Sequence, residues 1–185
     1  MYRLFKAIIP FNWSPIFEGP RIDLYGPLWI MATLLTTVCI VAWFSDWADS
    51  LVKGDEIETF DIKWISSCCS LLFSYFIGVP LFLHIVFKCS AVKKVGHPGF
   101  IWFLAVYGYS FTIFIPAALG YVIPLFMTWW VILICAGIIS LFFICKEIIQ
   151  ACTENLTGEW LKIVALVCAA LHGGLVLLLR FYYFA

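Results

Sequence analysis

The chain has 185 residues, of which 64% are hydrophobic and 12% are charged, and its mean hydropathy is +1.05. A soluble domain carries about a quarter charged residues, so this composition excludes an ordinary soluble fold and indicates an integral membrane protein. The formal net charge is zero, which leaves no basic face to neutralise phosphates and excludes nucleic acid as a partner.

The stretch RIDLYGPLWI, Arg21 to Ile30, stands directly before and within the first long apolar run. Pro27 suits the first turn of a helix, where its missing N–H costs nothing, and Gly26 frees the backbone to turn there. Asp23 can accept hydrogen bonds from the N–H groups of that turn or form an ion pair with Arg21. We interpret the stretch as an architectural junction rather than a catalytic motif.

The sequence contains five apolar runs. The length of each is close to the roughly 20 residues that a helix needs to cross the hydrocarbon core of a bilayer. Backbone groups in lipid must be hydrogen-bonded within their own segment, so each run is predicted to be a helix. The fold class is therefore all-α, a polytopic bundle of five transmembrane helices over residues 23–185 that follows a short cytosolic segment over residues 1–22. The predicted helices cover residues 28–44, 65–87, 100–119, 124–145 and 161–183.

Small residues recur at intervals of four in the second and fifth runs. Such residues let helix backbones approach closely in lipid, where no hydrophobic drive brings helices together. We expect both stripes to pack against other helices of the same chain, and a dimer interface is the alternative. The stripes consist of Ser66, Ser70, Ser74 and Gly78 in the second run and of Ala165, Ala169 and Gly173 in the fifth.

Ionisable and polar side chains at membrane depth are by default candidate functional groups. His84 precedes Lys88 by one helical turn, so we expect an interfacial role for it. His172 is deeper, and we expect a neutral imidazole bonded to a neighbouring helix, with a functional role as the alternative. A channel or transporter that uses these groups is a weaker alternative, because the sequence shows no inverted repeat and almost no buried charge. The third run adds Tyr107, Tyr109, Ser110 and Thr112.

Catalytic and metal-binding patterns are absent from the sequence, which contains no G-x-S-x-G, H-E-x-x-H or phosphate-binding loop. The chain is therefore predicted not to be an enzyme and to have no catalytic, cofactor-binding or metal-binding residues. The eight cysteines form no C-x-x-C pair, and those inside the apolar runs are interpreted as small apolar fillers. Palmitoylation is an alternative for Cys89, Cys145 and Cys152, which lie at the edges of the runs.

Basic residues near the ends of the runs predict the orientation in the membrane. They place the N-terminus in the cytosol and, with five spans, the C-terminus in the lumen. The glycosylation sequons at Asn12 and Asn155 then fall on the cytosolic side and are expected to carry no glycan. The cytosolic side receives Arg3, Lys6, Arg21, Lys88, Lys93, Lys94, Lys146 and Lys162, and the lumenal side Lys53, Lys63 and Arg180.

Two separated motifs stand out, DLYGPLWI at Asp23 to Ile30 and VYGYSFTIFIP at Val106 to Pro116. Together they resemble the signature of the Yip domain family, the Ypt-interacting proteins of the Golgi. The form is similar to the subclass that contains the human Yip-family members one and two, and the resemblance runs from about Pro20 to the C-terminus. The residues that carry it are Asp23, Leu24, Tyr25, Gly26 and Pro27 in the first motif and Tyr107, Gly108, Tyr109, Ser110 and Pro116 in the second.

The resemblance implies a five-span protein of the Golgi or endoplasmic reticulum that acts without catalysis in vesicle-mediated transport and Golgi organisation. Family members bind prenylated Rab-type GTPases and one another, so these proteins and the lipid bilayer are the expected partners. Arg21, Lys93 and Lys94 are the expected cytosolic contacts to a partner or to lipid. Members of this subclass usually carry a longer cytosolic region before the first helix, which favours, as the alternative, a structural subunit of a larger membrane complex.

Overall fold

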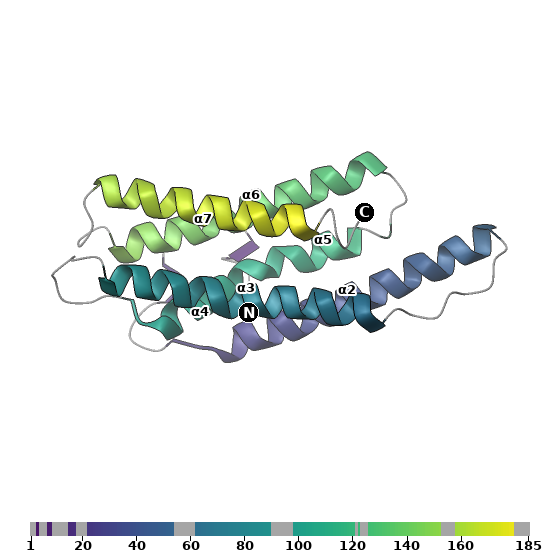
Figure 1. Ribbon diagram of the computed structural model, residues 1–185, viewed down its shortest axis with the longest axis horizontal. Helices are drawn as coiled ribbons and strands as arrows, with labels where there is room; N and C mark the ends of the chain where they lie inside the picture. Colours follow the sequence, from purple (N-terminus) through teal and green to yellow (C-terminus); the bar gives the residue numbers. More distant parts are fainter. Residues whose placement is uncertain are drawn as a thin grey trace.

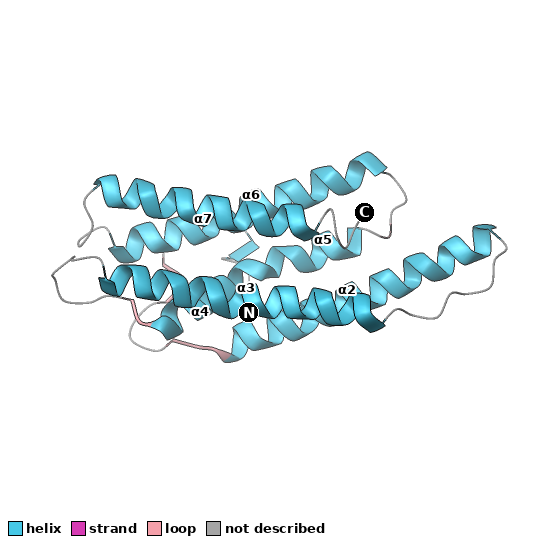
Figure 2. Ribbon diagram, viewed as in Figure 1, coloured by secondary structure: helices cyan, strands magenta, loops and turns pink. Residues whose placement is uncertain are grey.

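The computed structural model describes residues 3, 7–8, 15–17, 22–53, 62–89, 98–120, 122, 126–152 and 158–179. Every element longer than one turn within these ranges is an α-helix (Figures 1 and 2), which confirms the predicted all-α class. The elements in chain order are α2 (Tyr25–Lys53), α3 (Ile62–Cys89), α4 (Phe100–Ser110), the short 3-10 helix η1 (Phe111–Ile113), α5 (Phe114–Gly120), α6 (Phe126–Cys152) and α7 (Gly158–Leu178).

Four of the helical segments are long and apolar enough to cross a membrane. They are Tyr25–Val52, Lys63–Lys88, Phe100–Gly120 and Trp130–Ala151, the third being α4, η1 and α5 taken together. The apolar part of α7 is shorter and covers Lys162–Leu178. Its length is at the lower end of the range of about 17 to 25 residues found in membrane-spanning helices. The prediction of a polytopic membrane protein is confirmed by the length and composition of these helices.

Two helices continue past their predicted ends. α2 runs beyond Phe44 as far as Lys53, and α6 runs beyond Cys145 as far as Cys152. The prediction ended each helix where the apolar run gives way to polar residues. A helix outside the hydrocarbon core tolerates such residues, and within α6 the charges of Lys146 and Glu147 are paired.

The third predicted helix is not continuous, because η1 interrupts it between α4 and α5. Pro116 supplies the physical reason. It has no N–H to donate to the carbonyl of Thr112, one turn earlier, and its ring clashes with that carbonyl in a regular α-helix. The backbone tightens into a 3-10 turn just ahead of the proline instead.

The helices lie along the long axis of the molecule, with α4 and α5 in the interior (Figure 1). α4 contacts α2, α3 and α6, while α5 contacts α2 and α6, and α7 packs on α6. The core draws on every one of these longer helices. Its fully buried side chains include Met31, Leu72, Phe103, Phe143 and Leu175.

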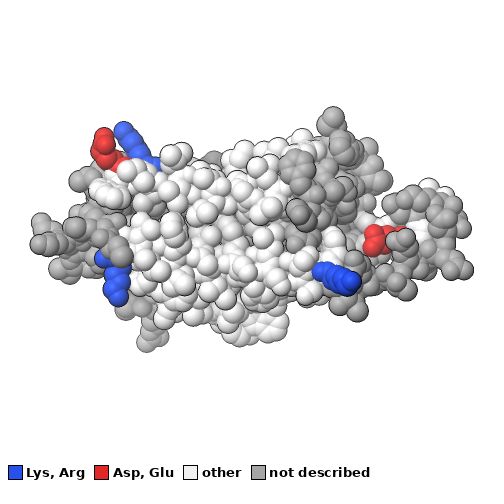
Figure 3. Space-filling view, viewed as in Figure 1, with Lys and Arg blue, Asp and Glu red and all other residues white. Residues whose placement is uncertain are grey.

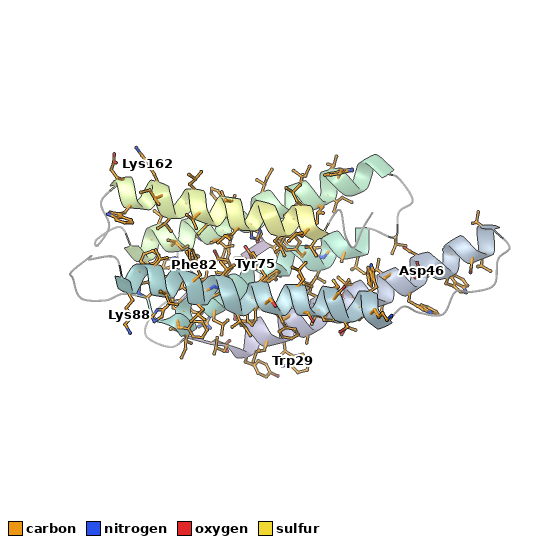
Figure 4. The ribbon with its side chains drawn as sticks, viewed as in Figure 1. Trp29, Asp46, Tyr75, Phe82, Lys88 and Lys162 are labelled. Carbon is orange, nitrogen blue, oxygen red and sulfur yellow. The ribbon has the colours of Figure 1, made fainter. Side chains whose placement is uncertain are left out.

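Charged side chains of the described residues lie toward the two ends of the bundle in the face shown in Figure 3, with an uncharged band between them. Lys88 and Lys162 lie at one end and Asp46 toward the other, whereas Trp29 lies between the ends (Figure 4). α2 starts inward of the end at which α3 finishes, and it extends past the first turn of α3 at the opposite end (Figure 1). This distribution suits a bundle whose middle is surrounded by lipid.

We expect a glycosylation acceptor inserted between α2 and α3, within residues 54–61, to be modified in endoplasmic reticulum membranes, whereas native Asn155 stays unmodified. The reason is that α2 ends and α3 begins at one end of the bundle, while α6 ends and α7 begins at the other (Figure 1). The gel shift after glycosidase treatment measures both sites, and a glycan on Asn155 would contradict the predicted orientation.

Candidate functional site

The first motif lies at the start of α2, and the second runs from the second half of α4 through η1 into α5. The two segments pack directly on each other. A Cβ atom added to Gly26 would overlap the hydroxyl of Tyr109. A Cβ atom added to Gly108 would overlap the ring of Pro27 and lie 3.0 Å from a ring carbon of Phe76. Each glycine therefore provides the space that a residue of the other motif occupies, which lets the two backbones approach closely.

This packing corrects our interpretation of Gly26. The residue lies in the first turn of α2, since the helix begins at Tyr25, and it does not form a turn ahead of the helix. Its lack of a side chain serves helix packing rather than backbone freedom. Pro27 occupies the first helical turn, as predicted, and there its ring packs against Gly108.

Asp23 is held by groups from three parts of the chain. Its Oδ1 accepts a hydrogen bond from the Tyr25 N–H at 2.9 Å, and its Oδ2 accepts one from the Tyr109 hydroxyl at 3.4 Å. The Nη1 atom of Arg3 lies 3.5 Å from the same Oδ2. The predicted hydrogen bond to the first turn is present, while the alternative partner Arg21 lies outside the described residues.

Two described residues near the N-terminus, Arg3 and Phe17, lie at the edge of this junction. The guanidinium of Arg3 lies over the ring of Phe17, 5.2 Å from its centroid. The ring of Phe17 in turn meets the ring of Tyr109 edge-on at 6.1 Å. Arg3, Phe17, Asp23 and Tyr109 thus form a chain of ionic, cation–π and aromatic contacts that ties the N-terminal segment to α4.

A cavity of about 730 Å³ opens beside the junction. Charged and aromatic side chains line one part of it, and apolar and threonine side chains from α2, η1 and α5 line the rest. The described lining consists of Arg3, Asp23, Tyr25, Gly26, Trp29, Ile30, Thr33, Tyr109, Thr112 and Ile115.

The other residues of the second motif bind the interior of the bundle together. Tyr107 is fully buried, and its hydroxyl donates to the Cys168 sulfur of α7 at 3.5 Å. The Ser110 hydroxyl donates to the Tyr107 carbonyl at 2.7 Å, and the Ser110 carbonyl accepts from the Ser140 hydroxyl of α6 at 2.9 Å. These residues satisfy backbone and side-chain polar groups just before the break at η1.

His172 behaves as the sequence suggested, because its Nδ1 lies 2.9 Å from the hydroxyl of Tyr75 in α3, at the middle of the bundle (Figure 4). The side chain of His172 is buried, and its ring also contacts the ring of Phe114 at 5.9 Å. His84 is half-buried, with its ring 6.3 Å from that of Phe100. Both histidines therefore link neighbouring helices.

Sequence reasoning missed a buried ion pair. It placed Lys146 among the surface charges of the cytosolic side, but the side chains of Lys146 and Glu147 are only 1% and 2% exposed and their charged atoms lie 3.2 Å apart. Glu147 Oε2 also accepts a hydrogen bond at 3.1 Å from the N–H of Ile16. The signal in the sequence was the apolar continuation IIQAC, which carries α6 on past the two charges.

The small-residue stripes do not pack as predicted. Ser66, Ser70, Ser74 and Gly78 are exposed on the surface of α3, and a Cβ atom at Gly78 or Gly173 would meet nothing within 4 Å in the described part of the chain. α3 instead buries a stripe of larger side chains, which includes Cys68, Leu72 and Phe76. Ala165 and Ala169 are half-buried on α7. Among the described residues, α3 therefore packs through larger side chains, whereas glycines provide the close contact at the α2–α4 junction.

Several predicted contacts lie outside the described residues. These are Arg21, Lys93 and Lys94, and the side chains of Cys89 and Cys152. Cys145 is half-buried within α6, so palmitoylation there stays an untested alternative. Among the described residues, His, Cys, Asp and Glu side chains form no group of three that could hold a metal ion.

We expect Gly108→Ala to destabilise the fold by about 1 to 3 kcal/mol, because the added methyl group overpacks the contact with Pro27. Gly26→Leu is expected to do the same through Tyr109. Gly78→Ala is the matched control, since its position is open, and it should change the free energy of unfolding by no more than about 1 kcal/mol. Denaturant unfolding in detergent micelles measures all three, and equal stability of Gly108→Ala and Gly78→Ala would refute the packing argument.

Glu147→Ala should destabilise the protein by about 3 to 5 kcal/mol, because it removes the carboxylate that compensates the buried charge of Lys146. Glu159→Ala, at an exposed acid in the first turn of α7, serves as the control and should have little effect. The combined change Lys146→Met with Glu147→Leu should recover most of the loss, since it removes both charges together. Failure of the double variant to recover stability would show that the ion pair is not the cause.

Comparison with known proteins finds curated proteins that are similar to this chain. The chain is 32% identical over 186 aligned residues to the Protein YIPF1 homolog of Dictyostelium discoideum, an alignment that covers 99% of this chain and 51% of the relative. The chain thus spans about half the length of the curated relative it matches. No protein-family profile and no solved structure matches the chain. The name of this relative agrees with the resemblance of the two motifs to the Yip family, and the match does not distinguish a subclass within that family.

Proposed function

We propose that this chain is a Yip-family membrane protein that acts without catalysis in vesicle-mediated transport and Golgi organisation. It resides in Golgi or early secretory membranes with its N-terminus in the cytosol and binds Rab-type GTPases and other Yip-family proteins. The observation that carries the proposal is the α2–α4 junction. Both motifs that prompted the resemblance lie in that one packed unit, within a chain similar along its whole length to a YIPF1 homolog.

The bundle supports this role by fixing charged groups at its ends. Lys88 and Lys162 come from different helices and lie at the same end, which is the predicted cytosolic end (Figure 4). Both side chains are exposed. A pair of cations held at the membrane surface can contact an acidic protein surface or anionic lipid, and the rigid bundle fixes their separation.

A test of this function uses crosslinking in native membranes followed by recovery of the full chain. We expect Rab-type GTPases and Yip-family proteins to copurify with the native chain. The double variant Lys88→Glu with Lys162→Glu should recover several-fold less of them, because the change reverses the charge of the partner-facing end. Lys63→Glu, an exposed position at the opposite end of α3, is the matched control and should recover native amounts.

Absence of both classes of protein from the native sample would refute the proposed function. A stronger effect of Lys63→Glu than of the double variant would refute the assignment of the partner-facing end. Light microscopy of the tagged chain provides the independent check on location, since the proposal requires a Golgi or endoplasmic reticulum distribution.

A structural subunit of a larger membrane complex is the second candidate, and the exposed stripe of α3 favours it. Ser66, Ser70, Ser74 and Gly78 leave a narrow helix face that a further helix can approach closely. The native mass after gentle solubilisation separates the two functions. A single large complex of fixed composition supports the structural role, whereas a small species with substoichiometric partners supports the trafficking role.

A further inference from the structure

The cavity beside the α2–α4 junction has two chemically different parts. Arg3 and Asp23 place opposite charges 3.5 Å apart, and their side chains are 32% and 43% exposed. Ile30, Thr33 and Ile115 line the part farther along the helices. The volume, about 730 Å³, lies within the about 300 to 1,000 Å³ range of small-molecule sites. This division fits a ligand with a charged head and an apolar tail.

The threonines of the cavity do not require polar partners from a ligand. Thr33 Oγ1 donates to the Trp29 carbonyl at 2.8 Å, and Thr112 Oγ1 donates to the Tyr109 carbonyl at 2.7 Å. Because both hydroxyls are already bonded to their own helices, this part of the wall accepts a hydrocarbon chain without leaving a donor unsatisfied.

The charged part is suited to a head group that carries both signs. Arg3 and Asp23 have no net charge together, so an anionic head group would meet repulsion from Asp23 and a cationic one repulsion from Arg3. A zwitterion placed alongside the pair would set its phosphate against the guanidinium and its ammonium against the carboxylate. Tyr25 and Trp29, whose ring centroids lie 5.9 Å apart, add two aromatic faces that attract an ammonium group.

The position of the cavity gives it access to the bilayer. Its walls come from α2 and from the α4–η1–α5 segment, both of which are long and apolar enough to span a membrane. Trp29 projects outward between the two ends of the bundle (Figure 4), and its side chain is 58% exposed. The cavity is therefore open to a molecule that is already in the membrane.

From these observations we propose that the cavity beside the α2–α4 junction binds one zwitterionic phospholipid, with its phosphate at Arg3, its ammonium at Asp23 and the first part of one acyl chain along Thr33 and Ile115. An isoprenoid chain lacks both charges and would make no ionic contact with Arg3 or Asp23. The binding site is separate from the proposed GTPase contacts at the end of the bundle.

Native mass spectrometry of the delipidated full chain in detergent tests this site. The chain is incubated with equal amounts of dioleoyl phosphatidylcholine, dioleoyl phosphatidylglycerol, dioleoylglycerol or farnesyl-cysteine methyl ester. We expect one bound phosphatidylcholine and at least about tenfold weaker retention of the other three, since each lacks one or both charges. Glycerophosphocholine, which has the head group without acyl chains, should not displace the bound lipid.

Variants locate the site. Thr33→Trp fills the apolar part of the cavity and should abolish retention of phosphatidylcholine. Thr36→Trp is the matched control, because Thr36 is an exposed threonine of α2 whose hydroxyl is also bonded to its own helix.

Arg3→Gln should weaken the retention of phosphatidylcholine about tenfold and leave the retention of dioleoylglycerol unchanged. Lys88→Gln is the control for this variant. Arg3→Gln leaves the α2–α4 contact in place, so it tests the site even if Thr33→Trp fails to fold.

The proposal is overturned if phosphatidylglycerol or dioleoylglycerol is retained as strongly as phosphatidylcholine. Such a result would mean that Arg3 and Asp23 do not select a zwitterionic head group. Retention of farnesyl-cysteine methyl ester alone would assign the cavity to an isoprenoid instead. Undiminished retention in both Thr33→Trp and Arg3→Gln would place the lipid elsewhere on the protein.

Discussion

The close approach of α2 to α4 is the constraint on which much of this structure depends. In lipid, helices gain no hydrophobic free energy by leaving the solvent, so contact must come from dense packing and a few polar bonds. Gly26 and Gly108 allow the dense packing, because a residue of the opposite helix occupies the space that a side chain at each glycine would fill. The hydrogen bond from Tyr109 to Asp23 can form only at this separation. The cavity and the anchoring of Phe17 both follow from the same contact.

Away from the junction, the bundle accommodates polar groups by pairing them, either within one helix or between two helices. Lys146 with Glu147, Tyr75 with His172 and Tyr107 with Cys168 are the main examples. An isolated charge or donor in this interior would cost several kcal/mol. The pairs of Tyr75 with His172 and of Tyr107 with Cys168 join different helices, so they also restrict which helices can lie side by side. Glu147 also accepts a hydrogen bond from the Ile16 N–H, which places Ile16 against the last part of α6.

The proposed contacts with lipid and with proteins fall on three separate surfaces. Exposed lysines lie toward the ends of the bundle, and Lys88 and Lys162 share the end that is proposed to contact other proteins (Figure 4). The small-residue face of α3 can receive another helix, and the cavity beside α2 can receive a single lipid. The proposed function without catalysis needs surfaces of this kind, because it consists of holding partners at defined places in a membrane.

The sequence by itself determined the class of this protein, an all-α membrane bundle, since the composition and the length of the apolar runs leave no other satisfied backbone structure. It also identified the two motif segments and the hydrogen bond from the first turn of α2 to Asp23. It could not show that Gly26 meets Tyr109 or that Gly108 meets Pro27, because those contacts join residues far apart in the chain. It was misled about the serine stripe of α3 and about Lys146 for the same reason. Spacing along a helix tells which residues share a face, and only the tertiary structure decides what that face meets.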